Sequence, residues 1–261
     1  MIENPLPSDW KMLQFGVARI LNEVGITATV EKKIATPRGE VEIDVYGVDE
    51  NSVENIRYIV ECKNWMTPIT QSVVHAFTTV MHECGGHIGM IIATNGLQEG
   101  AKRYLQSTNI VGLTYAEFQQ RYFHLWTKKY FYPRISQAAD ALIQYVEPLN
   151  FHRGRFVEKL TETSKEKFHS LQARYEIYGI VLGTMNVVET RYFSRHRATS
   201  LPDISEYKIQ FEREFGPEFR YNADYYRELA DEICEHIKRI TSEFDEIFGK
   251  NIFDCVEKNY V

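Results

Sequence analysis

The sequence predicts an α/β fold in its first half, with a mixed β-sheet flanked by helices, and a mostly α-helical second half. Strand and helix periodicities alternate up to about residue 120. Within that stretch, residues 88–93 form a continuous apolar run, which is typical of a strand buried on both faces. Near the other end, residues 222–248 carry one long apolar stripe at helical spacing. We therefore expect an α/β domain over residues 1–120 and a helical domain over residues 121–261.

The order of elements in the first half predicts the pairing of the strands. Residues 10–24 have apolar residues at helical spacing and end at Gly25, so a helix is expected there. The further elements expected are strands over 27–35, 41–46 and 56–63, a helix over 68–84, a strand over 88–93, a helix over 99–106 and a strand over 110–113. Short turns join the first three strands and favour antiparallel pairing, whereas the later strand–helix–strand crossover requires a parallel pair.

The second half shows fewer signals. Residues 122–132 are rich in aromatic side chains, and their pattern predicts neither a helix nor a strand. Helices are expected over 136–146 and 158–178, and a long one over 222–248, with Asn222 as its N-cap.

Composition excludes several classes of protein. The net charge is −6 and the pI about 5.8, so the chain as a whole should not be attracted to nucleic acid or to anionic membranes. The 4 cysteines stand far apart without a CxxC pair, which argues against a zinc module or a disulfide framework and favours reduced thiols. The first residues lack the pattern of a signal peptide, and no apolar run reaches the roughly 20 residues of a spanning helix. A cytoplasmic protein without membrane contact is expected.

The charge is distributed unevenly along the chain. Residues 1–120 hold 9 Lys and Arg against 14 Asp and Glu, residues 121–200 hold 13 against 7, and residues 201–261 hold 8 against 15. In the basic middle segment the cations alternate with aromatic residues, which suits phosphate contacts and base stacking, although a solvated helical surface has the same composition. The candidate nucleic-acid contacts there are Lys128, Lys129, Arg153, Arg155, Arg195 and Arg197. The acidic last segment is expected to support dimerisation or a partner subunit.

Three charged residues on two neighbouring strands form the candidate catalytic group. Glu61 and Lys63 are two residues apart on one strand and project to the same face, and Asp44 lies on the preceding strand. If the strands pair as a hairpin in register, two carboxylates and an ammonium converge. Repulsion between the carboxylates is relieved by a divalent cation, and hard oxygen ligands suit Mg²⁺, which polarises phosphoryl oxygens. The alternative is a solvated strand face.

The residues around this group resemble a known nuclease family. The segments Gly39-Glu40-Val41-Glu42-Ile43-Asp44-Val45-Tyr46-Gly47 and Val60-Glu61-Cys62-Lys63-Asn64-Trp65 are similar to the core of the PD-(D/E)xK nucleases, and most of all to Mrr-like restriction endonucleases. The similarity continues through Gln71 and residues 91–101, and covers roughly residues 8–118.

The resemblance implies a role for each matching residue. Asp44 and Glu61 would be metal ligands together with the backbone carbonyl of Cys62, Lys63 the catalytic lysine, and Gln71 a supporting glutamine. The implied cofactor is Mg²⁺, with Mn²⁺ as an alternative. The implied function is hydrolysis of phosphodiester bonds in DNA, in restriction or anti-phage defence. The protein would act as a homodimer or as an effector activated by a partner. One position departs from the family pattern, because Gln14 stands where many members carry an acidic residue. As an outer ligand a glutamine would hold a metal-bound water but bring no charge, which implies weaker metal binding or lower occupancy of a second ion.

Other candidates have a second interpretation of equal or greater weight. Glu42 shares a strand face with Asp44 and is either an outer ligand or a solvated residue. Trp65 either stacks on a base or sugar or packs on the sheet edge. The histidines at positions 75, 82 and 87 lack the spacing of a ligand pair and are expected at the surface. Two competing functions stay open, namely a catalytically inactive nucleic-acid-binding or assembly module and a nuclease directed at RNA.

Overall fold

A computed structural model describes residues 1–192 and 203–254 and divides the chain into two compact units. Unit 1 comprises Met1–Tyr130 and unit 2 comprises Phe131–Val261. No helix in the described residues is long and apolar enough to cross a membrane.

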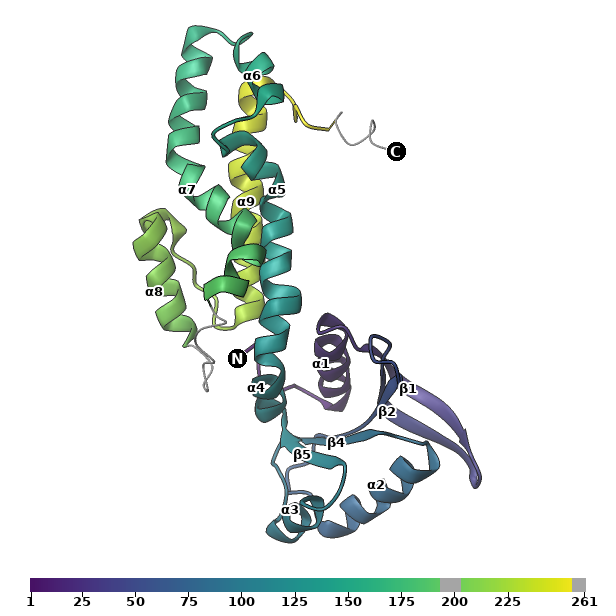
Figure 1. Ribbon diagram of the computed structural model, residues 1–261. Helices are drawn as coiled ribbons and strands as arrows, with labels where there is room; N and C mark the ends of the chain where they lie inside the picture. The colour runs from purple at the N-terminus through teal and green to yellow at the C-terminus, as the bar shows by residue number, and fades with distance from the viewer. Residues whose placement is uncertain (193–202, 255–261) are drawn as a thin grey trace. The chain divides into compact units, whose positions relative to one another are not determined.

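Unit 1 is a five-stranded mixed sheet with helices on both faces. Its elements are α1 (Trp10–Glu23), β1 (Thr27–Thr36), β2 (Gly39–Asp49), β3 (Ile56–Lys63), α2 (Gln71–Glu83), β4 (Ile88–Ala93), α3 (Glu99–Leu105), β5 (Ile110–Thr114) and α4 (Tyr115–Trp126). The strands lie in sequence order, with β1, β2 and β3 antiparallel and β3, β4 and β5 parallel. The predicted mixed sheet and the predicted pairing are confirmed. In Figure 1, α1 lies on one side of the sheet, and α2 and α3 lie on the other.

Different helices pack on the two faces of the sheet. The carboxylate of Asp9 caps α1 by accepting the Met12 N–H at 2.9 Å. The helix then buries an apolar stripe that includes Leu13, Val17 and Leu21. On the opposite face, buried residues of α2 pack in one cluster with strand residues: Val74, Phe77, Met81, Ile59 and Ile91. Full burial of each such side chain contributes about 1.5–3 kcal/mol, so both helices are firmly held to the sheet.

The predicted start of α2 near residue 68 is wrong. Ile69 forms a parallel bridge with Leu97, and its N–H donates to the carbonyl of Gly96 at 2.9 Å. This ties residue 69 to the sheet, and the helix begins only at Gln71.

Unit 2 is helical, as predicted. Its helices are α5 (Tyr132–Val146), α6 (Phe151–Val157), α7 (Glu162–Tyr192), α8 (Ile204–Phe215) and α9 (Tyr226–Phe248). The long helices α5, α7 and α9 lie side by side (Figure 1). Close approach of α7 to α5 requires glycine, because a Cβ at Gly183 would lie 1.8 Å from Ile143 Cδ1. The Ser136 hydroxyl donates to the Gly183 carbonyl at 2.6 Å and fixes the same contact.

Several elements differ from the sequence prediction. Residues 122–132 are helical, since they hold the end of α4, the π-helix η1 (Thr127–Phe131) and the start of α5. The short helices α6 and α8 were not predicted. Asn222 is not the N-cap of α9, which begins at Tyr226 with Tyr225 as its cap. The Glu228 carboxylate accepts the Tyr225 N–H at 3.2 Å and thereby sets this later start.

Candidate active site

Asp44 stands where the pairing between two strands stops. The ladder of β2 and β3 ends at Val45 and Val60. Beyond it, the Cys62 N–H donates to Asp44 Oδ2 at 2.7 Å, so a side-chain carboxylate takes the place of a backbone acceptor. The register of β1 and β2 also skips Asp44 and Glu31, and Glu31 has a φ of 51°, in the left-handed region that non-glycine residues seldom adopt. Asp44 therefore sits at a local distortion of the sheet and contacts the neighbouring strand.

The second oxygen of Asp44 is held from α1. Gln14 is 3% exposed, and its Nε2 donates to Asp44 Oδ1 at 2.8 Å. The amide nitrogen must be the donor because an ionised carboxylate only accepts. Each carboxylate oxygen thus takes one N–H and keeps capacity for a further interaction. Gln14 holds Asp44 in place, a role that the sequence did not predict.

Glu61 and Lys63 lie next to each other at the end of β3. The Lys63 ammonium forms an ion pair with Glu61 Oε1, and the side chain of Lys63 is 22% exposed and that of Glu61 27%. Burial raises the pKa of the Glu61 carboxyl, the hydrogen bond from Lys63 opposes this, and the negative charge of Asp44 raises the pKa further. The Asp44 carboxylate therefore acts on Glu61 through its charge. The structure brings Asp44, Glu61 and Lys63 together.

The donor atoms at this end of the sheet suit a hard divalent cation. The N–H and C=O of a strand residue point to the same side, so the Cys62 carbonyl is directed toward the side where Asp44 lies. Two carboxylates and a carbonyl form an all-oxygen set that fits Mg²⁺ or Mn²⁺. The described residues hold no group of three His, Cys, Asp or Glu that could bind a metal, so the carbonyl would have to be the third protein ligand. The Cys62 thiol is buried, and this burial raises its pKa well above the usual range.

Gln71 is paired with a histidine rather than with the carboxylates. It is exposed at the first turn of α2, and its Nε2 lies 3.2 Å from His75 Nε2. The His75 ring packs on Tyr104 of α3, with centroids 4.3 Å apart. The i, i+4 spacing of Gln71 and His75 on a helix was the signal that could have predicted this contact. His87 lies elsewhere, since its Nδ1 accepts the Arg57 N–H at 3.0 Å at the other end of β3.

Trp65 and Glu42 occupy the surface near the site. Trp65 is 43% exposed, and Lys63 Nζ lies 5.6 Å from the centroid of its ring. Its carbonyl accepts hydrogen bonds from Thr94 Oγ1 at 3.0 Å and Asn95 Nδ2 at 2.8 Å. Glu42 is exposed and stands opposite Lys33 in the ladder, as a solvated strand residue does.

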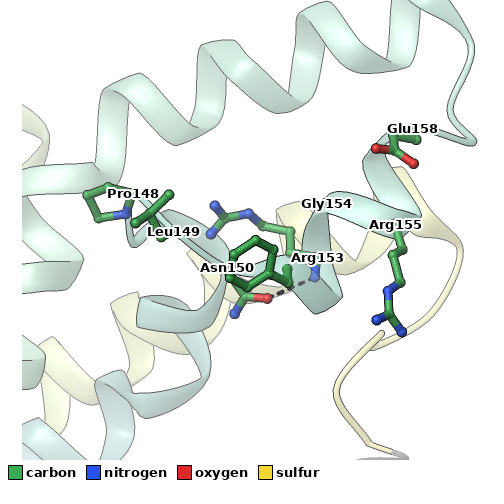
Figure 2. Close-up of a pocket in the computed structure, with 8 residues that line it drawn as sticks. Pro148, Leu149, Asn150, Arg153, Gly154, Arg155 and Glu158 are labelled. Carbon is green, nitrogen blue, oxygen red and sulfur yellow. Dashed lines mark hydrogen bonds between the residues drawn. The ribbon is translucent and has the colours of Figure 1, made fainter.

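The predicted phosphate contact at Arg153 is wrong. Arg153 is 6% exposed, and its guanidinium donates to the carbonyls of Gln144 at 2.9 Å and Glu147 at 2.8 Å. It therefore satisfies the C-terminal carbonyls of α5, and burial lowers its pKa. Figure 2 shows Arg153 and Arg155 extending in different directions from α6, and Arg155 is exposed.

The remaining basic candidates fall into two groups. Lys128 and Lys129 are exposed on η1 and stay available for an anionic ligand. Arg195 and Arg197 lie outside the described residues.

Comparison with known proteins gives one family match. Residues 7–122, which extend from just before α1 into α4, match the family model Mrr_cat, described as restriction endonuclease. No curated protein matches the chain. A solved structure entitled "Crystal Structure of Protein of Unknown Function AF1548" is 12% identical, with coverage of 90% of this chain and 99% of that one and a TM-score of 0.38.

Proposed function

We propose that the protein is a metal-dependent endonuclease that hydrolyses phosphodiester bonds of DNA, because residues 7–122 match a restriction endonuclease family model. The observation that carries this proposal is the convergence of Asp44, Glu61 and Lys63 at the end of β3. Two carboxylates that repel each other beside one ammonium are costly for the fold alone. The same three groups are well suited to act on a phosphate.

Each residue of the site has a distinct task in this proposal. Asp44 and Glu61 hold Mg²⁺ or Mn²⁺ together with the Cys62 carbonyl. A bound divalent cation supplies polarisation of the phosphoryl oxygen and lowers the pKa of water. The Gln14 amide and the Cys62 N–H keep the Asp44 carboxylate in one orientation, so little reorganisation is needed when substrate arrives. Lys63 orients the attacking water or stabilises the charge that develops on the phosphate.

The biological setting that we propose follows from the family of the domain. The protein would act in restriction or anti-phage defence, either by itself or as an effector whose nuclease a partner switches on. Cleavage of both strands generally needs two active sites, so we propose a homodimer or a partner subunit bound through the helices of unit 2. Exposed Lys128, Lys129 and Arg155 are the candidate phosphate contacts. Free thiols at the described cysteines support a reducing compartment, in keeping with the cytoplasm.

Two observations favour a second candidate, an inactive nucleic-acid-binding or assembly module. Gln14 brings no charge to the site, and within residues 1–192 and 203–254 no group of three potential side-chain ligands occurs. RNA is a further substrate to test, because the carboxylates and Lys63 act on the phosphate that RNA and DNA share.

One experiment separates these functions. Supercoiled plasmid and structured RNA are incubated with the protein and Mg²⁺ or EDTA, alongside the Lys63→Ala and Asp44→Asn variants. Exposed Lys102 on α3 gives a control variant, Lys102→Ala. We expect Mg²⁺-dependent cleavage of DNA that falls at least about 100-fold in the two site variants, the usual cost of removing a group that stabilises the transition state. Cleavage that survives both substitutions would refute the assigned site. Binding without cleavage by the unmodified protein would favour the module.

A further inference from the structure

The segment that follows Lys63 presents an exposed aromatic side chain beside the candidate catalytic lysine. Trp65 is 43% exposed and Met66 is 92% exposed. Both are apolar. They lie between the half-buried Lys63 at the end of β3 and the fully buried Ile69 before α2. Large apolar side chains at this exposure carry a hydration cost, which contact with an apolar or aromatic ligand would remove.

The backbone of this segment is held in place at both ends. The Trp65 carbonyl accepts from Thr94 Oγ1 at 3.0 Å and from Asn95 Nδ2 at 2.8 Å. The Thr94 N–H donates to the Lys63 carbonyl at 3.1 Å. The residues directly after β4 thus bind the backbone on either side of Asn64. At the far end, Ile69 is fully buried, and its N–H donates to the Gly96 carbonyl at 2.9 Å. The Trp65 ring is thus carried on an anchored backbone.

The Trp65 ring lies close to the Lys63 ammonium. Lys63 Nζ lies 5.6 Å from the centroid of the Trp65 ring. A phosphate bound at the Lys63 ammonium would therefore lie beside the Trp65 ring, where the base of the same or the adjacent nucleotide can contact the ring. A cation beside an aromatic ring matches a phosphate beside a base.

We propose that Trp65 stacks on a nucleobase that has left the base stack next to the scissile phosphate, with Met66 as an apolar wedge beside it. This inference rests on the proposed nuclease function and specifies its substrate. Inside a duplex both faces of each base are covered by neighbouring bases, so the ring can bind only a base that has been unstacked. The substrate is therefore a single strand, or a duplex that is opened or kinked at the cleavage point.

Tryptophan fluorescence tests this proposal without any cleavage. The sequence holds 3 tryptophans, of which Trp10 is 49% exposed and Trp126 is buried. The full chain in EDTA is titrated with a short single-stranded DNA, the same sequence as a blunt duplex, and that duplex with unpaired central nucleotides. We expect the single strand to quench the emission. Trp65→Phe should lose the quenching but keep most of the affinity, and Trp10→Phe should keep both.

The affinities of Trp65→Ala give the second measurement. Base stacking on an aromatic ring is worth about 1–3 kcal/mol, which corresponds to a roughly 5- to 150-fold weaker binding of the single strand. Binding of the blunt duplex should change much less. If the centrally unpaired duplex is weakened like the single strand, an opened duplex can supply the stacked base, and if it is not, a free strand is needed. Far-UV circular dichroism and thermal unfolding verify that the variant folds.

Three results would overturn the inference. They are unchanged binding of the single strand by Trp65→Ala, quenching that persists in Trp65→Phe, and equal weakening of the single strand and the blunt duplex. An equal loss of both would assign Trp65 to general support of the surface. Quenching without any cleavage by the loaded protein would favour the inactive module and leave the stacking site standing, whereas cleavage with no effect of Trp65 would support the nuclease and refute the stacking site.

Discussion

The hydrogen bond between Gln14 and Asp44 leads to a quantitative prediction for Gln14→Glu. The Gln14 amide nitrogen lies 2.8 Å from Asp44 Oδ1, so a glutamate there places a second carboxylate against the first. Two unit charges about 4 Å apart at an effective dielectric constant of about 20 interact with roughly 4 kcal/mol, here repulsive. We expect the metal-free variant to lose up to about 4 kcal/mol of unfolding free energy at pH 8.

A divalent cation should reverse most of this loss. It neutralises the added charge, so Mg²⁺ should stabilise Gln14→Glu more than it stabilises the unmodified protein. Urea unfolding in EDTA and in saturating Mg²⁺ gives the stabilities, and titration calorimetry with Mn²⁺ gives the affinity and stoichiometry. Gln14→Met removes the donor without adding charge, and should cost about 1.5–3 kcal/mol with no special recovery in Mg²⁺.

A second buried glutamine provides the matched control. Gln119 is fully buried in unit 1, and its Oε1 accepts the Glu3 N–H at 3.0 Å, away from the carboxylates. Gln119→Glu should also destabilise the fold, but Mg²⁺ should not restore it. If Gln14→Glu and the unmodified protein were equally stable in EDTA and responded equally to Mg²⁺, Gln14 would not face Asp44 and the reasoning would fail.

Three further predictions concern stability. Burial and Asp44 raise the pKa of Glu61 above its usual 4.5, so in metal-free protein the cost of the charged form is present above that raised pKa and disappears as the pH falls toward 4.5. As the pH is lowered from 7 to 5, the unfolding free energy of the unmodified protein should therefore rise relative to that of Glu61→Gln. A difference between the two proteins that does not change with pH would contradict this. Gly183→Ala should cost about 1–3 kcal/mol, since its Cβ meets Ile143 Cδ1 at 1.8 Å, whereas Gly154→Ala, with nothing within 4 Å, should stabilise by about 0.5–1 kcal/mol in thermal melts. Arg153→Ala should lower stability by about 1–3 kcal/mol in urea unfolding, because it leaves two helix-end carbonyls unpaired. Unchanged stability would mean that Arg153 does not bind these carbonyls and is free to contact phosphate.

The sheet of unit 1 could be predicted because its strands carry strong local signals. Residues 88–93 are apolar throughout and are buried as β4, and the short turns between β1, β2 and β3 fix their antiparallel pairing. α4 gave a weaker signal, because aromatic residues such as Phe118 and Trp126 fill its buried face and favour helices less than aliphatic residues do. Its capping box, formed by Thr114 and Glu117, was a readable sign of the start.

The contacts within the candidate site could not be predicted from local sequence patterns. The position of Gln14 followed from the family pattern, but its contact with Asp44 joins residues 30 positions apart and depends on how α1 packs. Arg153 illustrates the same limit, since a count of charges cannot tell a surface cation from one that caps buried carbonyls. Tertiary packing decides both cases.

The bond from the Cys62 N–H to Asp44 makes this aspartate part of the framework as well as of the proposed chemistry. Loss of Asp44 would leave a buried strand amide without an acceptor, which costs folding free energy whether or not the domain cleaves anything. A lineage that abandoned catalysis would therefore still be under pressure to keep an acceptor at this position. Lys63, whose ammonium is partly exposed and bonded only to Glu61 among these groups, has no comparable structural hold. Among domains of this kind, the lysine is thus the better diagnostic of an active enzyme.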